Sequence, residues 1–277
     1  MIFLKFIRDD GAIMNIGDGA EDYELLSKTG TSNVEVEHYY DAKGSGYGDW
    51  HSGERVKGRT LKYKITSHTG IAASRRFMEF FFNVLHKFRV ESYFNGREVY
   101  LDAELMTPKH TEDLYSHEEV EITFYASDPY WKSLDDTVRN FYTQSALWHY
   151  PYALVEPNQD LPANAYTVFE RINVNKTVYV YNDGDAPALF TITIHGAVDN
   201  PEVKINDALI KYNGTVGSGE SLFIDSENGV YQLDGKNVLK DMIVLGEPML
   251  KTGDNVLVSN KEMFGTVNYH KLYNGDM

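Results

Sequence analysis

The chain of 277 residues contains no cysteine. It therefore has no disulfide framework, no thiolate nucleophile and no cysteine-type zinc site. Its apolar runs also fall well short of the roughly 18 residues that a membrane-spanning helix needs. These absences argue against a membrane protein, lend no support to a secreted origin and favour synthesis in a cytoplasm.

The N-terminal stretch MIFLKFIRDDG lacks the features of a signal peptide. It has no basic first region and no small-residue cleavage site. We expect it to form a first strand.

Basic residues are in deficit, since 26 Lys and Arg face 41 Asp and Glu, giving a formal net charge of -15. Such a charge repels nucleic-acid phosphates and anionic membranes. The composition thus predicts that neither nucleic acid nor membrane is the main partner.

Catalytic and metal-binding motifs are missing as well. The nine histidines include no HExxH spacing, so we interpret His86 as an ordinary helix-surface or core histidine. The stretch GSGYGDW (44–50) lacks the GxGxxG frame and is expected to be a flexible loop, and no GxSxG elbow occurs. We predict no enzyme activity, no catalytic residue, no metal site and no cofactor.

What the sequence does contain is a repeated alternation of apolar and polar residues, which is typical of half-buried strands. The alternating positions are Val34 and Val36; Leu61, Tyr63 and Ile65; Val99, Leu101, Ala103 and Leu105; Val120, Ile122 and Phe124; Phe190, Ile192 and Ile194; Val203 and Ile205. One segment, IAASRRFMEFFFNVLHKF (71–88), instead spaces its apolar residues by three and four, which predicts one amphipathic helix of about 16 residues. The chain is therefore expected to be mainly antiparallel β.

The length favours two domains. We assign 1–135 to an N-terminal, β-sandwich-like domain with one helix and extended hairpins, and 136–164 to a proline-containing linker. Residues 165–277 have short strands and Asn- and Gly-rich turns, which predict a C-terminal β-sandwich. Its last strand is a candidate to return to the first domain.

Aromatic residues make up 13% of the chain. Tyr and Trp suit either a protein interface or a sugar-stacking platform, and their spread along the chain favours the interface. Trp148, in the linker, fits packing between domains better than a partner site.

The stretch EITFYASDPYW (121–131) reads as a strand that stops at a proline. Pro129 cannot donate to a sheet ladder and Asp128 can cap the turn, so the chain is expected to leave the sheet there. Tyr130 and Trp131 would hold the exit.

This stretch resembles the end of the N-terminal domain in the distal tail proteins (Dit) of long-tailed phages that infect Gram-positive bacteria. The segment NDGDAPALFTITIHGAVDNPEVKI, with Asn200 and Pro201 at a turn, and SGESLFIDSENG, with Asp225 at another, are similar to that family's second domain. GDNVLV resembles its closing strand, with Thr252 where a proline is common.

The resemblance implies a virion structural protein of a phage or tail-like particle, made in the host cytoplasm. In that family the N-terminal domain forms a hexameric ring at the tail tip and the C-terminal domain is galectin-like. The resemblance further implies that the protein joins the tail tube to the tail-associated lysin or fibre and to receptor-binding proteins.

Two other functions stay open at this point. A carbohydrate-binding protein would present aromatic and polar side chains on one sheet face toward cell-wall glycans. A glycoside or peptidoglycan hydrolase would require two carboxylates with shifted pKa values in a cleft, and no pattern in the sequence indicates such a pair.

Overall fold

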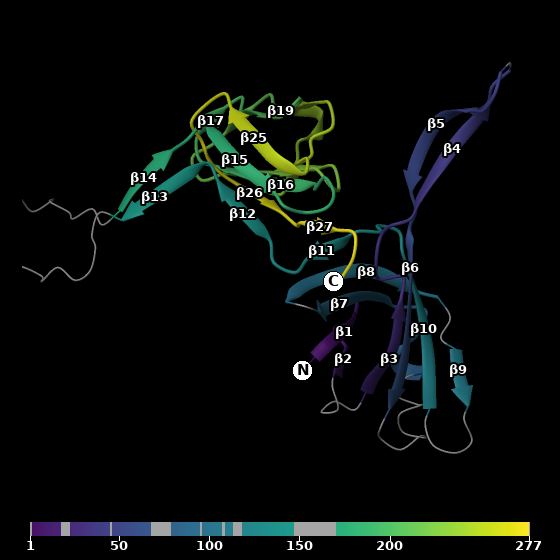
Figure 1. The fold of residues 1–277 in the computed structure, drawn as a ribbon. Coiled ribbons are helices and arrows are strands. Elements are labelled where there is room, and N and C mark those ends of the chain that lie inside the picture. Colours follow the sequence, from purple (N-terminus) through teal and green to yellow (C-terminus); the bar gives the residue numbers. More distant parts are fainter. Residues whose placement is uncertain are drawn as a thin grey trace, which may run out of the picture. The chain divides into compact units, whose positions relative to one another are not determined.

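The structure is a computed structural model that describes residues 2–17, 23–44, 46–67, 79–94, 96–106, 109–112, 118–146 and 170–276. The chain divides into two compact units (Figure 1). Unit 1 comprises Met1–Asp135, Gly184–Ala186 and His270–Met277, and unit 2 comprises Asp136–Asp183 and Pro187–Tyr269. No helix in the described ranges is both long enough and apolar enough to cross a bilayer.

Unit 1 is built on one antiparallel sheet with the strand order β2-β1-β7-β8-β10-β6-β3. Three short strands extend this sheet, because β9 pairs with β10 and β11 pairs with both β8 and β27. The strands of the sheet are β1 (Ile2–Arg8), β2 (Ile13–Gly17), β3 (Tyr23–Thr29), β6 (Arg59–Ser67), β7 (Lys87–Phe94), β8 (Arg97–Leu105), β9 (Lys109–Glu112), β10 (Glu118–Ala126), β11 (Trp131–Ser133) and β27 (Leu272–Tyr273).

The sheet of unit 1 curls around its own core. β1 and β6 stand four places apart in the strand order, which is about 19 Å in a flat sheet. Yet the rings of Phe6 on β1 and Tyr63 on β6 have centroids 5.4 Å apart, and Phe6 also stacks on Phe124 of β10 at 5.5 Å. The alternating apolar residues of these strands therefore line one enclosed aromatic core.

Two further strands, β4 (Val36–Ala42) and β5 (Asp49–Val56), pair only with each other among the described strands. They form an antiparallel hairpin that projects from the end of the unit 1 sheet (Figure 1). We call this hairpin the arm.

The helix expected over 71–88 is wrong in its second half. Helical backbone ends at residue 81, and the chain has entered β7 by Lys87; residues 68–78 lie outside the described ranges. The adjacent rings of Phe81 and Phe82 are both buried in the core of unit 1, and the Asn83 side chain accepts the Leu85 N–H at 3.0 Å in a turn that ends the helical backbone. The predicted helix-face residues Val84 and Leu85 are consequently exposed.

Unit 2 contains two main antiparallel sheets, with strand orders β12-β26-β16-β21-β22-β23 and β15-β25-β18-β19-β24. Two small pairs, β13 with β14 and β17 with β20, and the 3-10 helix η1 (Leu239–Asp241) complete it. Its strands are β12 (Thr137–Asn140), β13 (Tyr142–Ala146), β14 (Glu170–Val174), β15 (Thr177–Asn182), β16 (Phe190–His195), β17 (Val198–Asp199), β18 (Glu202–Ile205), β19 (Ala208–Tyr212), β20 (Thr215–Val216), β21 (Ser221–Asp225), β22 (Val230–Leu233), β23 (Lys236–Asn237), β24 (Met242–Leu245), β25 (Gly253–Ser259) and β26 (Phe264–Tyr269).

Alternate residues of both unit 2 sheets are buried. Ile192 on β16 and Val267 on β26 represent one sheet, and Ile205 on β18 and Leu257 on β25 represent the other; each is at most 1% exposed. Strands with one buried face in two sheets are the pattern of a β-sandwich.

β12 and β13 lie within the sequence predicted as a linker, and β12 pairs with β26.

The mainly β fold with two β-rich units, predicted from the sequence, is confirmed. The domain limits 1–135, 136–164 and 165–277 stay a prediction. All of the alternating segments named from the sequence are strands with a buried apolar face, except the first, since Val36 lies on the arm and is 40% exposed.

Candidate functional site

The turn predicted at Asp128–Trp131 joins β10 to β11. Asp128 Oδ1 accepts the N–H of Tyr130 at 3.2 Å, and Lys132 Nζ lies 3.4 Å from Asp128 Oδ2. Pro129 is buried and Trp131 is 0% exposed, inside the core of unit 1. In the described part of the chain the Trp131 Nε1 atom finds no hydrogen-bond acceptor, so apolar packing holds this side chain.

The other predicted residues occupy turns of unit 2. Asn200 has a φ of 46° and its carbonyl accepts the Asn260 side-chain amide at 3.1 Å, while Pro201 is buried. Asp225 Oδ1 accepts the N–H groups of Glu227 and Asn228 at 2.9 and 3.1 Å. Trp148 lies outside the described residues. The structure does not gather these residues into one site, and their role at interfaces stays a prediction.

The segment from Leu272 to Asp276 is anchored in unit 1. β27 pairs with β11, placing Tyr273 opposite Trp131. Asp276 is fully buried, and its Oδ2 atom lies 2.7 Å from Lys28 Nζ and 2.9 Å from the Ser92 hydroxyl. We call residues 272–276 the C-terminal anchor.

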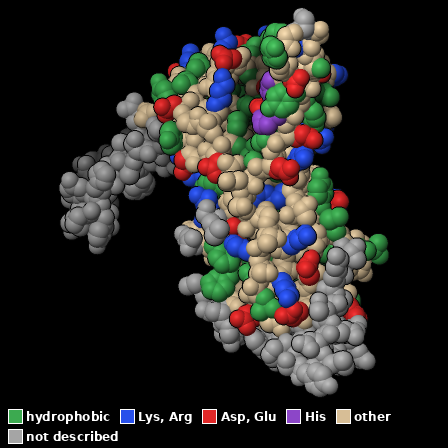
Figure 2. Space-filling model, turned by 45° about the vertical axis from the view of Figure 1, so that its right-hand side comes forward, with side chains coloured by type: hydrophobic (Ala, Val, Ile, Leu, Met, Phe, Trp, Pro, Cys, Tyr) green, Lys and Arg blue, Asp and Glu red, His purple; other side chains and the backbone are tan. Residues whose placement is uncertain are grey.

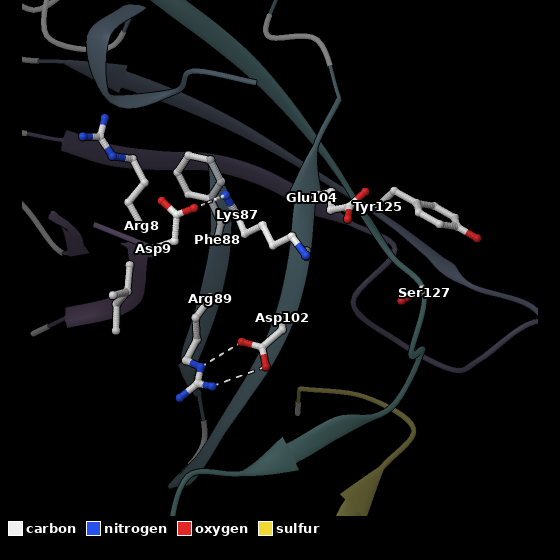
Figure 3. A pocket seen from close by; sticks show the side chains of 11 residues that line it. Arg8, Asp9, Lys87, Phe88, Arg89, Asp102, Glu104, Tyr125 and Ser127 are labelled. Carbon is white, nitrogen blue, oxygen red and sulfur yellow. Dashed lines mark hydrogen bonds and ion pairs between the residues drawn. The ribbon is translucent and has the colours of Figure 1, made fainter. Parts of the chain in front are cut away.

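A groove of about 540 Å³ lies on unit 1 and is lined by residues of β1, β7, β8 and β10 (Figure 3). Arg89 donates to Asp102 at 2.8 and 3.3 Å, and its guanidinium lies over the Tyr100 ring. Glu104 and Tyr125 stand on the side of the groove formed by β8 and β10 (Figure 3). The lining contains three basic and three acidic side chains.

The charges at the β1 end of this groove are already paired. Arg8 donates to Asp10 and to the Phe80 carbonyl, while Asp9 contacts His86 Nδ1 at 2.6 Å and caps the N–H of Lys87. The hydrogen bond from His86 lowers the pKa of Asp9, and the one from Arg8 lowers the pKa of Asp10. Carboxylates held ionised in this way are poor general acids. The groove therefore has the character of a charge-balanced protein surface.

The arm exposes aromatic side chains to an unusual degree. Tyr40 is 61% exposed, Trp50 66% and Tyr47 100%. Register places Tyr40 opposite His51 on one face of the arm and Trp50 opposite Asp41 on the other. The arm has aromatic side chains on two solvent-exposed faces and buries no core of its own. Such a surface is typical of a segment that packs on another chain.

A second exposed apolar surface covers the outward face of the five-stranded sheet of unit 2. Tyr179 and Tyr181 on β15 are 75% and 60% exposed, and Tyr179 lies opposite Val256 of β25. Leu245 on β24 adds another exposed side chain on the far edge of this sheet. On the face drawn in Figure 2, apolar side chains are interspersed with charged ones.

The sequence predicted extended hairpins and a last strand that could return to the first domain, but it did not place the arm at residues 36–56 and did not indicate the partners of Asp276. The arm interrupts the sheet order, and Gly46 and Gly48, both with positive φ, lie in the turn region between its strands. The dense run of Tyr, His and Trp between 38 and 51 was the available signal, because it lacks the alternation of apolar and polar residues that is typical of a half-buried strand. The partners of Asp276 are up to 248 residues away in sequence, so no local pattern indicates them.

No protein-family model matches the sequence, and a search of curated proteins finds no match. The fold is nevertheless shared with solved structures. The crystal structure of the Dit protein of phage SPP1, described as a paradigm of the hub adsorption apparatus in phages that infect Gram-positive bacteria, matches with a TM-score of 0.68 and 11% identity. That match covers 97% of this chain and 98% of the SPP1 chain.

A chain of the phage P2 baseplate, in its activated conformation with calcium, matches with a TM-score of 0.52 at 11% identity, covering 98% of both chains. At this identity the likeness establishes the fold and leaves the activity to other arguments. This chain has the fold of a phage distal tail protein, the family that its sequence resembles.

Proposed function

We propose that the protein is a structural hub of a phage tail tip or tail-like particle, and that it acts without catalysis. The observation that carries the proposal is the extent of the fold likeness, which spans 97% of this chain and 98% of a protein described as an adsorption hub. A likeness over nearly the whole of both chains supports a shared role more than a likeness over one domain would.

In this proposal six copies form a ring through unit 1, and unit 2 meets other tail components. A closed ring needs two different complementary surfaces on each subunit. The arm, with aromatics on both faces, and the charge-balanced groove are suited to this purpose. The proposed partners are the tail tube protein, the tail-associated lysin or fibre, and receptor-binding proteins, and the proposed location is the virion tail tip.

The direct test is the mass of the purified full chain by light scattering over a concentration series, alone and after co-expression with the tail tube protein. We expect particles of six times the chain mass of 31.6 kDa. Negative-stain images of these particles are expected to show rings. A chain that stays monomeric both alone and with the tube protein contradicts the proposal.

A second candidate is carbohydrate binding by unit 2, favoured by the outward face of its six-stranded sheet. Thr191 and Asn268 lie opposite each other there, as do Thr193 and Thr266, and Phe264 is 43% exposed beside them. Hydroxyls and amides next to an exposed ring suit a sugar. The test is binding of the protein to purified cell-wall polysaccharide. Binding by the native chain and by the control Tyr179→Ala, on the other sheet, together with loss of binding by Phe264→Ala, would support this function.

A further inference from the structure

Three potential metal ligands meet on the arm. One ligand atom from each of His38, His51 and Glu54 lies within 4.8 Å of the others, and all three side chains are exposed. His38 Nδ1 stands 3.6 Å from Glu54 Oε2, and the imidazole centroids of His38 and His51 are 5.7 Å apart. None of the three residues lines the groove or belongs to the C-terminal anchor.

A β-bulge brings these residues to one face. Tyr39 pairs with Gly53 while Tyr40 pairs with His51, so Ser52 is an extra residue in β5. In a regular strand, residues 51 and 54 point to opposite faces because side chains alternate. With the bulge, His51 and Glu54 point to the same face, and Glu54 lies directly opposite His38.

We propose that His38, His51 and Glu54 form a site for one divalent transition-metal ion, with Zn²⁺ as the ion that best fits the ligands. Two imidazoles and one carboxylate are a ligand set that Zn²⁺ uses, with water in the fourth position. Tetrahedral ligands at 2.0–2.1 Å from the metal are about 3.3 Å apart, so modest rotamer changes of exposed side chains are enough to close the site. Calcium and magnesium favour all-oxygen sites instead.

The expected effect of the ion is to fasten β4 to β5. A two-stranded hairpin is marginally stable in water, and the arm has no third strand among the described residues. A metal ion that joins His38 of β4 to two residues of β5 holds the register across the bulge. The Tyr40 ring, edge-on to His51 with centroids 5.6 Å apart, limits where that imidazole can turn. This inference does not depend on the hub function.

The test is equilibrium dialysis of the full chain, stripped with a chelator, against ZnSO₄, with bound metal measured by mass spectrometry. We expect about one Zn²⁺ per chain, and about tenfold or greater loss of affinity in each of His38→Ala, His51→Ala and Glu54→Gln. His195→Ala, which removes an exposed histidine of β16, is the matched control and is expected to bind as the native chain does. Undiminished binding by a variant lacking all three ligands, or no binding by the native chain, overturns the site.

A second measurement separates a structural role from mere affinity. Amide hydrogen exchange of residues 36–56 is expected to slow when Zn²⁺ is added to the native chain, and to stay unchanged when it is added to Glu54→Gln. The folding of unit 1 is monitored in the same experiment through the amides of β7 and β8. Equal exchange with and without Zn²⁺ in the native chain would show that no metal joins the two strands.

Discussion

At the scale of single residues, positions close to the backbone of a neighbouring strand set the tightest limits on the sequence. Gly30 follows β3 with a φ of 80°, and a Cβ atom added there would lie 1.9 Å from the Thr60 carbonyl oxygen of β6. Gly11 has a similar φ of 87° but nothing within 4 Å of its added Cβ. A substitution at Gly11 therefore tests backbone strain alone, whereas a substitution at Gly30 tests backbone strain together with steric overlap.

We therefore expect Gly11→Ala to lower the free energy of unfolding by about 1–2 kcal/mol, the cost of a left-handed backbone at alanine. Gly30→Ala carries the same cost and also forces β3 and β6 apart, for a loss on the order of 4 kcal/mol. Urea denaturation followed by circular dichroism measures both variants. Equal losses for the two would mean that β3 yields to the added methyl group without strain.

Residues also show how far the sequence can be interpreted. The strand pattern around Ile122 and Phe124 correctly predicts burial, because alternation in a two-faced sheet is a local property. The pairing of Asp276 with Lys28 depends on segments far apart in the chain, and no local rule identifies it. Of the candidate residues, Asp128 and Asp225 are placed in turns by the chemistry of Asx side chains, which is also local.

At the scale of elements, the sequence-based predictions failed where one sequence pattern is compatible with two kinds of secondary structure. The run from 71 to 88 has helical spacing, but its last apolar residue, Phe88, belongs to β7 and faces the core. Aromatic burial in unit 1 thus overrides the helical period. The extended hairpins predicted for the first domain were not located in the sequence, because the short alternation at Val34 and Val36 indicates a strand but not that both of its faces meet solvent.

The arm leads to a prediction about assembly. Replacing Tyr40 and Trp50 together by serine removes one exposed aromatic from each face of the arm, and we expect the proposed ring to dissociate toward monomers. Replacing Tyr179 and Tyr181 by serine removes a matched pair of exposed aromatics from unit 2 and is expected to leave the ring mass unchanged. Light scattering measures both. Loss of the ring in the unit 2 variant alone would show that the ring interface lies on unit 2 and not on the arm.

At the scale of the whole molecule, the chain enters each unit more than once. Unit 1 combines residues 1–135 with 184–186 and 270–277, so no single cut separates the two units. A fragment that ends at residue 135 lacks β27 and the buried carboxylate of Asp276. The stability of unit 1 is therefore expected to depend on residues at the opposite end of the sequence.

Deleting residues 270–277 is expected to destabilise unit 1 while unit 2 keeps its fold. The deletion unpairs β11 from β27 and leaves Lys28, 15% exposed at its side chain, without its carboxylate partner. Hydrogen exchange is expected to accelerate in β7 and β8 and to stay unchanged in β16 and β25. Acceleration in both units would contradict the separate stability of unit 2.

The single substitution Asp276→Asn isolates the ion pair from the strand. We expect it to lower the free energy of unfolding by about 2–3 kcal/mol, because Lys28 Nζ loses a fully buried, charged partner 2.7 Å away. Asp207→Asn removes the partner of Lys251 at 3.0 Å, but both side chains are exposed, so its cost is expected to stay below about 0.5 kcal/mol. If the two substitutions lower the free energy of unfolding equally, the backbone pairing of β27 alone accounts for the attachment of the C-terminal anchor to unit 1.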